Sequence, residues 1–239
     1  MLYKVAERFK SIQGEGVYAG TPMAFIRFVG CSVGKRICQH CDTDFDKTYP
    51  WRGGGEFTER DLLLWAYPYR HVCLTGGEPL DQDLEPLIKD NEHVDLFHIE
   101  TSGTKEIPDW MEEYLLSVTN PSFMQRIWIC VSPKPGFIED VVDAADEVKV
   151  IVPGLGEMTD ALRKQLWESG PPGSYNNVLR WPGLEDALRW EAAGKIVFLQ
   201  PRNAKFDVDK QNLLYVQDLI RDNPQLRLSV QLHKILKVQ

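Results

Sequence analysis

Short apolar segments alternate with amphipathic segments along most of the chain, and this alternation restricts the possible folds more than any other feature. The sequence predicts apolar strands at residues 22–30, 71–75, 94–100, 126–132, 147–152, 195–199 and 226–233. It predicts helices at residues 58–66, 84–89, 108–118, 158–168, 183–193 and 210–220, and loops at 49–57 and 169–177. The first helix begins with Thr58 and Asp61, which are spaced like a capping box. Strands and helices in this alternation build a parallel sheet or barrel, so the fold class is α/β.

Polar residues follow the ends of four predicted strands. They are Glu78, Thr101–Ser102, Ser132–Lys134 and Gln200–Pro201. The carboxyl ends of parallel strands lie on one face of a sheet or barrel, and ligands bind at that face. The sequence therefore predicts one pocket to which all four segments contribute.

Length and charge narrow the class of protein. The chain has 239 residues, and we expect a single domain over residues 1–239. A net charge of −8 argues against nucleic acid as a partner. No apolar run is long enough for a membrane span, and the N-terminus lacks the pattern of a secretory signal. We therefore expect a cytoplasmic protein with reduced thiols and no membrane partner.

Three of the five cysteines fall within eleven positions, in a segment at about 31–45. Cys31, Cys38 and Cys41 form a C-x6-C-x2-C pattern. A structural zinc site normally has four ligands, and His40 is the only nearby fourth donor. An iron–sulfur cluster held by three thiolates leaves one iron open to a substrate or cofactor. Spacing alone leaves zinc, such a cluster, and unconnected cysteines as alternatives.

The other two cysteines have a simpler interpretation. Cys73 and Cys130 both fall inside predicted apolar strands, where a free cysteine behaves as a small buried hydrophobic residue.

The segment TGGEP at residues 75–79 changes the balance between these alternatives. Its two glycines follow a strand and allow a ligand to approach the main chain closely. A three-cysteine loop after one strand and GGEP after the next resemble the radical S-adenosylmethionine superfamily. The resemblance implies that Cys31, Cys38 and Cys41 hold a [4Fe–4S] cluster whose fourth iron binds S-adenosylmethionine. The usual spacing is C-x3-C-x2-C, so the first loop is three residues longer here.

Motifs along almost the whole chain narrow the resemblance. They are FKSIQGEGVYAGTPMAFIRFVGC (9–31), CDTDF (41–45), TGGEP, ETSGT (100–104), VSPKP (131–135), EVKVIV (147–152), FLQP (198–201) and RLSVQLHK (227–234). Together they resemble the 7-carboxy-7-deazaguanine synthase family, which contracts 6-carboxy-5,6,7,8-tetrahydropterin with loss of ammonia during queuosine-type 7-deazapurine biosynthesis. The resemblance implies an incomplete, modified (β/α) barrel, a homodimer, and a carbon–nitrogen lyase that uses Mg2+. It also implies a flavodoxin- or ferredoxin-type electron donor.

The same resemblance assigns residues to the pterin substrate. Arg27 is a guanidinium in an otherwise apolar strand and suits the substrate carboxylate, although pairing with a structural acid is the alternative. Glu15 is expected to accept from the amino-pyrimidine edge. The other expected substrate contacts are Gln13, Thr75, His233 and the C-terminal Gln239. His233 and Lys234 are expected to end the last strand on the pocket side.

The remaining assignments concern the cofactors. By resemblance, S-adenosylmethionine contacts Gly76, Gly77, Glu78, Ser102, Ser132, Lys134 and Gln200. Thr43 matches a position that gives a hydroxyl ligand to Mg2+, which takes few protein oxygens. Asp42 is expected to be a nearby acceptor or a turn residue. No residue is assigned as a general acid or base.

Two other functions fit parts of the pattern. A glycyl-radical-enzyme activase of the same superfamily shares the cluster and GGEP, but has no evident use for Arg27 or for QGEG at residues 13–16. A non-enzymatic module stabilised by zinc is the alternative from a different class.

Overall fold

The computed structural model describes residues 1–38, 41, 43–89, 91, 93–117, 126–154, 181–203 and 207–238. Its strands are β1 (Tyr3–Ile12), β2 (Pro22–Phe28), β3 (Gly55–Phe57), β4 (His71–Gly76), β5 (Leu96–Thr101), β6 (Ile127–Val131), β7 (Glu147–Val152), β8 (Ile196–Pro201) and β9 (Arg227–Leu228). Its helices are α1 (Gly34–Ile37), α2 (Glu59–Ala66), α3 (Glu85–Ile88), α4 (Asp109–Ser117), α5 (Glu139–Asp143), α7 (Leu184–Ala192), α8 (Lys210–Asp222) and α9 (Leu232–Leu236). Two 3-10 turns, η1 (Pro50–Arg52) and η2 (Pro79–Asp81), complete the described elements.

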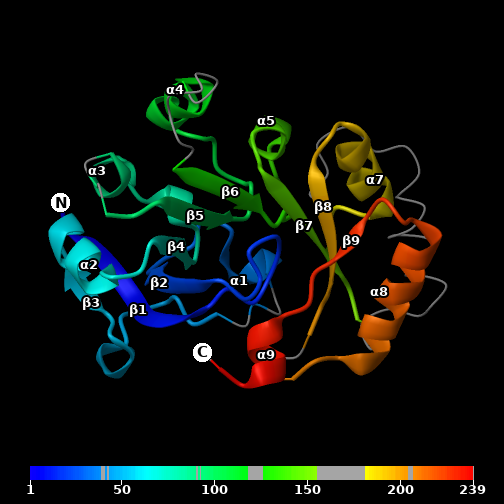
Figure 1. Ribbon diagram of the computed structural model, residues 1–239, viewed down its shortest axis with the longest axis horizontal. Helices are drawn as coiled ribbons and strands as arrows, with labels where there is room; N and C mark the ends of the chain where they lie inside the picture. The colour runs from blue at the N-terminus through cyan, green and yellow to red at the C-terminus, as the bar shows by residue number, and fades with distance from the viewer. Residues whose placement is uncertain are drawn as a thin grey trace.

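All nine described strands belong to one sheet, in the order β3-β1-β2-β4-β5-β6-β7-β8-β9. The strands from β2 to β9 pair in parallel, whereas β1 is antiparallel to both β2 and β3. Because β3 and β9 stand at opposite ends of this order, the sheet does not close. Figure 1 shows the strands as an open arc, with α3, α4 and α5 along one side and α7 and α8 beyond β8. The expected incomplete α/β barrel is confirmed.

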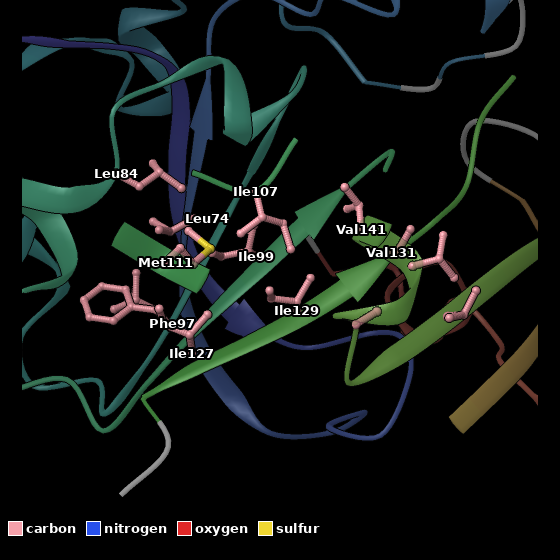
Figure 2. Close-up of a cluster of buried hydrophobic side chains, with 14 of the residues drawn as sticks. Leu74, Leu84, Phe97, Ile99, Ile107, Met111, Ile127, Ile129, Val131 and Val141 are labelled. Carbon is pink, nitrogen blue, oxygen red and sulfur yellow. The ribbon is translucent and has the colours of Figure 1, made fainter. Parts of the chain in front are cut away.

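One face of the sheet is apolar and carries the main core. Successive side chains of a strand point to opposite faces, so alternate residues of each strand enter this core. Figure 2 shows Leu74, Phe97, Ile99, Ile127 and Ile129 gathered on that face together with side chains from the surrounding helices and loops. Burial of such side chains contributes roughly 1.5–3 kcal/mol each.

The opposite face, called the inner face below, carries polar and charged residues. Strand register places Arg27 beside Thr75 and Glu100 beside Cys130, and Lys149 shares this face with Glu147. Charged residues in the middle of a sheet are costly to bury without partners, so this face is where a site is expected.

The sequence prediction was wrong for three segments of the sheet and its edges. Residues 3–12 form β1, a strand that was not predicted, because a bulge between Val5 and Glu7 breaks the alternation. Residues 49–57, predicted as a loop, contain η1 and the edge strand β3. The predicted strand 226–233 is only β9, after which the chain turns into α9.

Other predictions agree with the structure. β7 has the bounds that the apolar run predicted, and Thr58 and Asp61 form a reciprocal capping box at the start of α2. The predicted helix 158–168 and loop 169–177 lie outside the described residues. Among the described helices, none has both the length and the apolar character required to cross a membrane.

Candidate active site

The three-cysteine segment and the GGEP segment lie against each other at the ends of β2 and β4. The amide of Glu78 donates to the carbonyl of Gly30 at 3.1 Å, directly before the first cysteine of the segment. A Cβ atom on Gly77 would lie 2.7 Å from the Cβ of Cys31. The two motifs therefore form one structural unit.

The glycines of GGEP are required by this packing. Gly76 has a φ of +132°, a conformation that residues with side chains rarely adopt. A Cβ on Gly77 would lie 1.5 Å from the carbonyl oxygen of Gly30. The close approach that these glycines allow is thus to the backbone of the neighbouring strand end, which is a different reason from the ligand contact that the sequence suggested.

The Glu78 carboxylate is fully buried and joins the ends of β4 and β5. Its Oε1 accepts from the Leu80 amide at 3.1 Å and from the Thr101 hydroxyl at 2.7 Å. Its Oε2 accepts from the Ser102 amide at 2.9 Å and from the Ser102 hydroxyl. Each carboxylate oxygen therefore satisfies one backbone donor that has no other partner in the turn.

Further hydrogen bonds extend this connection to the neighbouring strands. The Ser132 amide donates to Thr101 O at 2.8 Å, and the Lys134 amide donates to Ser102 O at 3.1 Å. The Lys134 ammonium folds back onto Ser132, at 2.6 Å from its carbonyl and 2.8 Å from its hydroxyl. The polar residues after β4, β5 and β6 are thus in contact, as the sequence predicted.

The long C-x6-C loop contains its own helical turn, α1, between Cys31 and Cys38. All three cysteines are free thiols, and none of them is fully buried. Burial raises the pKa of Cys31, and amides at Val33 and Gly34 act against that rise. Burial also raises the pKa of Cys38; Lys134 acts against this rise, and Cys41 and Cys31 add to it.

This donor set fits a cluster held by three thiolates. Within the described part of the chain, which excludes His40 and Asp42, no three His, Cys, Asp or Glu side chains converge on one point where a single metal ion would bind. A four-ligand zinc site requires such convergence. In a [4Fe–4S] cluster each thiolate binds a different iron atom, so the thiols need only surround a common volume.

Arg27 lies on the inner face and has an acidic partner. Its Nε donates to Glu7 Oε1 at 2.8 Å, and its Nη1 donates to Thr43 Oγ1 at 3.4 Å. Glu7 also accepts from Arg52 at 3.5 Å. The pairing that sequence analysis kept as an alternative for Arg27 is therefore present, and it uses the Nε side of the guanidinium. The same geometry brings together Arg27 and Thr43, which are 16 residues apart in the sequence.

An ion cluster occupies the middle of the inner face, with a buried lysine between two half-buried carboxylates. Lys149 Nζ donates to Glu15 Oε2 at 2.8 Å and to Glu100 Oε2 at 2.7 Å. Gln13 donates to the other oxygen of Glu100 at 3.0 Å, and Gln231 donates to the other oxygen of Glu15 at 2.8 Å. Burial alone would raise the pKa of Glu15, but Lys149 and the hydrogen bonds of this cluster lower it to about 2.

The turn between β1 and β2 is fixed to the inner face by further contacts. The Val17 amide donates to Glu147 Oε2 at 2.8 Å, and the Gly16 amide donates to the Ser229 hydroxyl at 3.3 Å. Ser229 in turn donates to Gln200 Oε1 at 2.8 Å. Gln200, predicted to be at the pocket, is therefore connected to the turn that carries Gln13 and Glu15.

His233 reaches this turn from α9 and not from a strand. A Cβ on Gly14 would lie 2.2 Å from His233 Nδ1, so the ring packs directly on that glycine. His233 also acts electrostatically to lower the pKa of Glu15. The prediction that His233 and Lys234 end the last strand was wrong, because Leu232 donates to Gly14 O and the chain turns into α9 there. Gln239, Asp42 and His40 lie outside the described residues.

Sequence reasoning missed several charged residues of the inner face. Glu100 and Lys149 each stand in a strand that is mostly apolar, which is the signal that identified Arg27, and that signal applied to every strand would have found them. Glu7 lacks it, because β1 also contains Lys4, Arg8 and Lys10. Ser229 and Gln231 carry no such signal, and their partners in the β1–β2 turn are more than 200 residues away.

Comparison with known proteins gives the family. No protein-family model matches the chain. It is 32% identical to a 7-carboxy-7-deazaguanine synthase of Bradyrhizobium diazoefficiens over 256 residues, covering 100% of both chains. It is also 32% identical to a synthase of that name from Nitratidesulfovibrio vulgaris, over 80% of this chain and 91% of the relative. The solved structure of QueE from Escherichia coli superposes with a TM-score of 0.59 at 24% identity, covering 97% of this chain and 94% of that chain, and shares the fold. The chain belongs to the 7-carboxy-7-deazaguanine synthase family.

Proposed function

We propose that this protein is a 7-carboxy-7-deazaguanine synthase, a radical S-adenosylmethionine lyase that contracts 6-carboxy-5,6,7,8-tetrahydropterin and releases ammonia. One observation carries the proposal: a charged inner face, with an arginine at one end and a buried carboxylate cluster in the middle, adjoins a unit made of the cysteine and GGEP segments. A glycyl-radical-enzyme activase of the same superfamily would have no evident use for Arg27 or for the QGEG turn.

The three cysteines would hold the cluster, and the chain would bind S-adenosylmethionine beside it. When bound, these two groups supply the radical chemistry that removes hydrogen from the pterin. The side chain of Glu78 is occupied by Leu80, Thr101 and Ser102, so its part in cofactor binding is to shape the turn. The main chain at Gly76 and Gly77 and the groups of Ser102, Ser132, Lys134 and Gln200 would contact the cofactor.

The substrate would lie across the inner face. The Nη atoms of Arg27 would bind its carboxylate in the bidentate geometry that a guanidinium offers, while Glu7 fixes the Nε side. Gln13, Glu15, Thr75 and His233 would contact the ring system, with Glu15 facing the amino-pyrimidine edge. These side chains orient the pterin and exclude water from it.

Magnesium would bind the substrate next to Arg27. The hydroxyl of Thr43 lies 3.4 Å from Arg27 Nη1, so an ion on this hydroxyl could share the substrate carboxylate with the guanidinium. Magnesium accepts a single protein ligand when substrate oxygens and water complete its octahedron. We further propose that one domain spans residues 1–239, that it works as a homodimer, and that a flavodoxin- or ferredoxin-type protein supplies its electrons.

The test is anaerobic turnover. The protein is incubated with 6-carboxy-5,6,7,8-tetrahydropterin, S-adenosylmethionine, Mg2+ and a strong reductant, and the deazapurine is followed by absorbance and mass spectrometry. We expect 7-carboxy-7-deazaguanine and an equal amount of ammonia. The yield of both products should fall when Mg2+ is omitted. A colourless protein that contains zinc, or an iron-bearing protein that leaves the pterin unchanged, would contradict the proposal.

A further inference from the structure

Lys149 is the centre of the ion cluster on the inner face, and the proposed reaction gives it no role. Its side chain is 3% exposed, and its ammonium contacts Glu15 at 2.8 Å and Glu100 at 2.7 Å. These carboxylates come from the β1–β2 turn and from β5, while Lys149 is in β7. One ammonium thus connects three segments that are far apart in the sequence.

Lys149 is the cation that contacts the carboxylates of this cluster, and its removal would leave them without that positive charge. Glu147, on the same strand and the same face, adds a third carboxylate, and burial raises its pKa. Taking the cation away would leave the half-buried carboxylates of Glu15 and Glu100 facing each other, with His233 as a further influence on Glu15, and like charges at this distance favour protonation of one of them. One of them would take up a proton and become a donor on one oxygen.

The protonation state of Glu15 matters because we assign the amino-pyrimidine edge of the substrate to this carboxylate. The amino-pyrimidine edge of a pterin presents N–H groups, and an ionised carboxylate only accepts hydrogen bonds. A protonated Glu15 would accept less well, and among the described residues Gln231 would be the one hydrogen-bond donor left on its carboxylate. Gln13 fixes the far side of Glu100, so the whole arrangement has a defined orientation.

We propose that Lys149, anchored by Glu100, is a positioning residue that keeps Glu15 ionised and oriented toward the N–H groups of the substrate, and thereby sets the preference for a 2-amino pteridine. The inference rests on the proposed function. It predicts that selectivity between pteridines depends on a lysine that does not touch them.

The experiment compares two stable fluorescent probes on the anaerobically purified holoenzyme. 6-Carboxypterin has the 2-amino group, and 6-carboxylumazine has an oxygen in its place; both keep the carboxylate that Arg27 would bind. Dissociation constants are measured by fluorescence titration. We expect the wild type to bind the pterin at least about tenfold more tightly than the lumazine, because a donor to an ionised acceptor is replaced by an acceptor.

The decisive variant is Lys149→Met, with Lys89→Met as its matched control. Lys89 forms an exposed pair with Glu85 at 2.6 Å, and its removal should leave the preference unchanged. Lys149→Met should reduce the preference to less than about threefold, mainly by weakening pterin binding. Equal weakening of both probes would indicate a purely structural lysine and would overturn the proposal, as would an unchanged preference.

A second variant separates stability from selectivity, and it serves if Lys149→Met does not fold. The double substitution Lys149→Met with Glu100→Gln removes the cation and one anion together, so it should recover stability lost in the single variant. Because the double variant also lacks the Glu100 carboxylate that competes with Glu15 for ionisation, the preference for the pterin should recover toward the wild-type value. A double variant whose preference is as low as that of Lys149→Met would refute the proposal. Failure of the wild type to bind 6-carboxypterin at all would instead count against the proposed function.

Discussion

Replacement of Glu78 by glutamine tests the structural role of the GGEP carboxylate. Oε1 accepts the Leu80 amide and Oε2 accepts the Ser102 amide, and neither amide can turn away. Glutamine has one oxygen, so one of these two buried N–H groups must face its NH2. The hydroxyls of Thr101 and Ser102 can rotate and adapt.

The magnitude follows from this count. One orphaned buried donor costs about 1–3 kcal/mol, and the hydrogen bonds that remain lose their charge assistance. We therefore expect Glu78→Gln to lower the free energy of unfolding by about 2–4 kcal/mol. The matched control is Glu85→Gln, at an exposed carboxylate paired with Lys89, where the loss should be below about 0.5 kcal/mol.

The assay is urea denaturation followed by circular dichroism under anaerobic conditions, with both variants and the wild type side by side. A second readout is iron content, which should fall in Glu78→Gln because the Glu78 turn packs against Gly30 and Cys31. If Glu78→Gln unfolds within about 0.5 kcal/mol of the wild type, the four hydrogen bonds do not brace the turn and the reasoning fails.

Three further predictions concern the site. Arg27→Ala should raise the KM for the pterin at least about tenfold and leave the iron content unchanged. The control Arg70→Ala, at an exposed ion pair, should change neither the KM nor the iron content. Normal substrate affinity in Arg27→Ala would disprove the carboxylate role. Cys38→Ala should lose the cluster and all turnover, while Cys73→Ala at a buried core position should retain iron; equal iron in both would be inconsistent with the ligand assignment. Although burial acts to raise the pKa of Glu15, its partners lower this pKa in the folded protein from 4.5 to about 2. The difference in free energy of unfolding between the wild type and Glu15→Gln should therefore be largest above pH 4.5 and decrease as the pH falls toward 2. A loss that did not change over this range, measured by denaturation, would contradict the low pKa.

The parallel strands were predictable because they contain runs of apolar residues. Most of them pair with a neighbouring strand on each side in the sheet. The run at 147–152 predicted β7 without error, and polar residues after the strands predicted which segments meet at one end of the sheet. Helix α2 was predictable from its local capping signal. These features depend on residues that are close in sequence.

The parts that were missed depend on distant contacts or on local irregularity. The bulge after Val5 hides the alternation of β1, and the alternation of residues 226–233 suggests a strand where the chain makes α9. At the start of α9 the Leu232 amide donates to Gly14 O, a contact between distant segments that no local pattern reveals.

The site was predicted in outline and missed in its centre. Arg27 and Lys149 carry the same signal, a single basic residue in an apolar strand, but only Arg27 was matched to a group of the substrate. Their acidic partners, Glu7 and Glu100, were missed as well. The glycines of GGEP were assigned to ligand approach, and the structure adds a requirement that the sequence did not suggest, the close packing of Gly77 on the backbone of Gly30.

The measurement that tests the central claim most directly is the electron paramagnetic resonance spectrum of the reduced, anaerobic protein before and after S-adenosylmethionine is added. Three cysteine ligands leave one iron open, so we expect a [4Fe–4S] signal whose g-values shift when the nucleotide binds. A spectrum whose g-values do not change when S-adenosylmethionine is added, together with a fourth protein ligand on the cluster, would contradict the account.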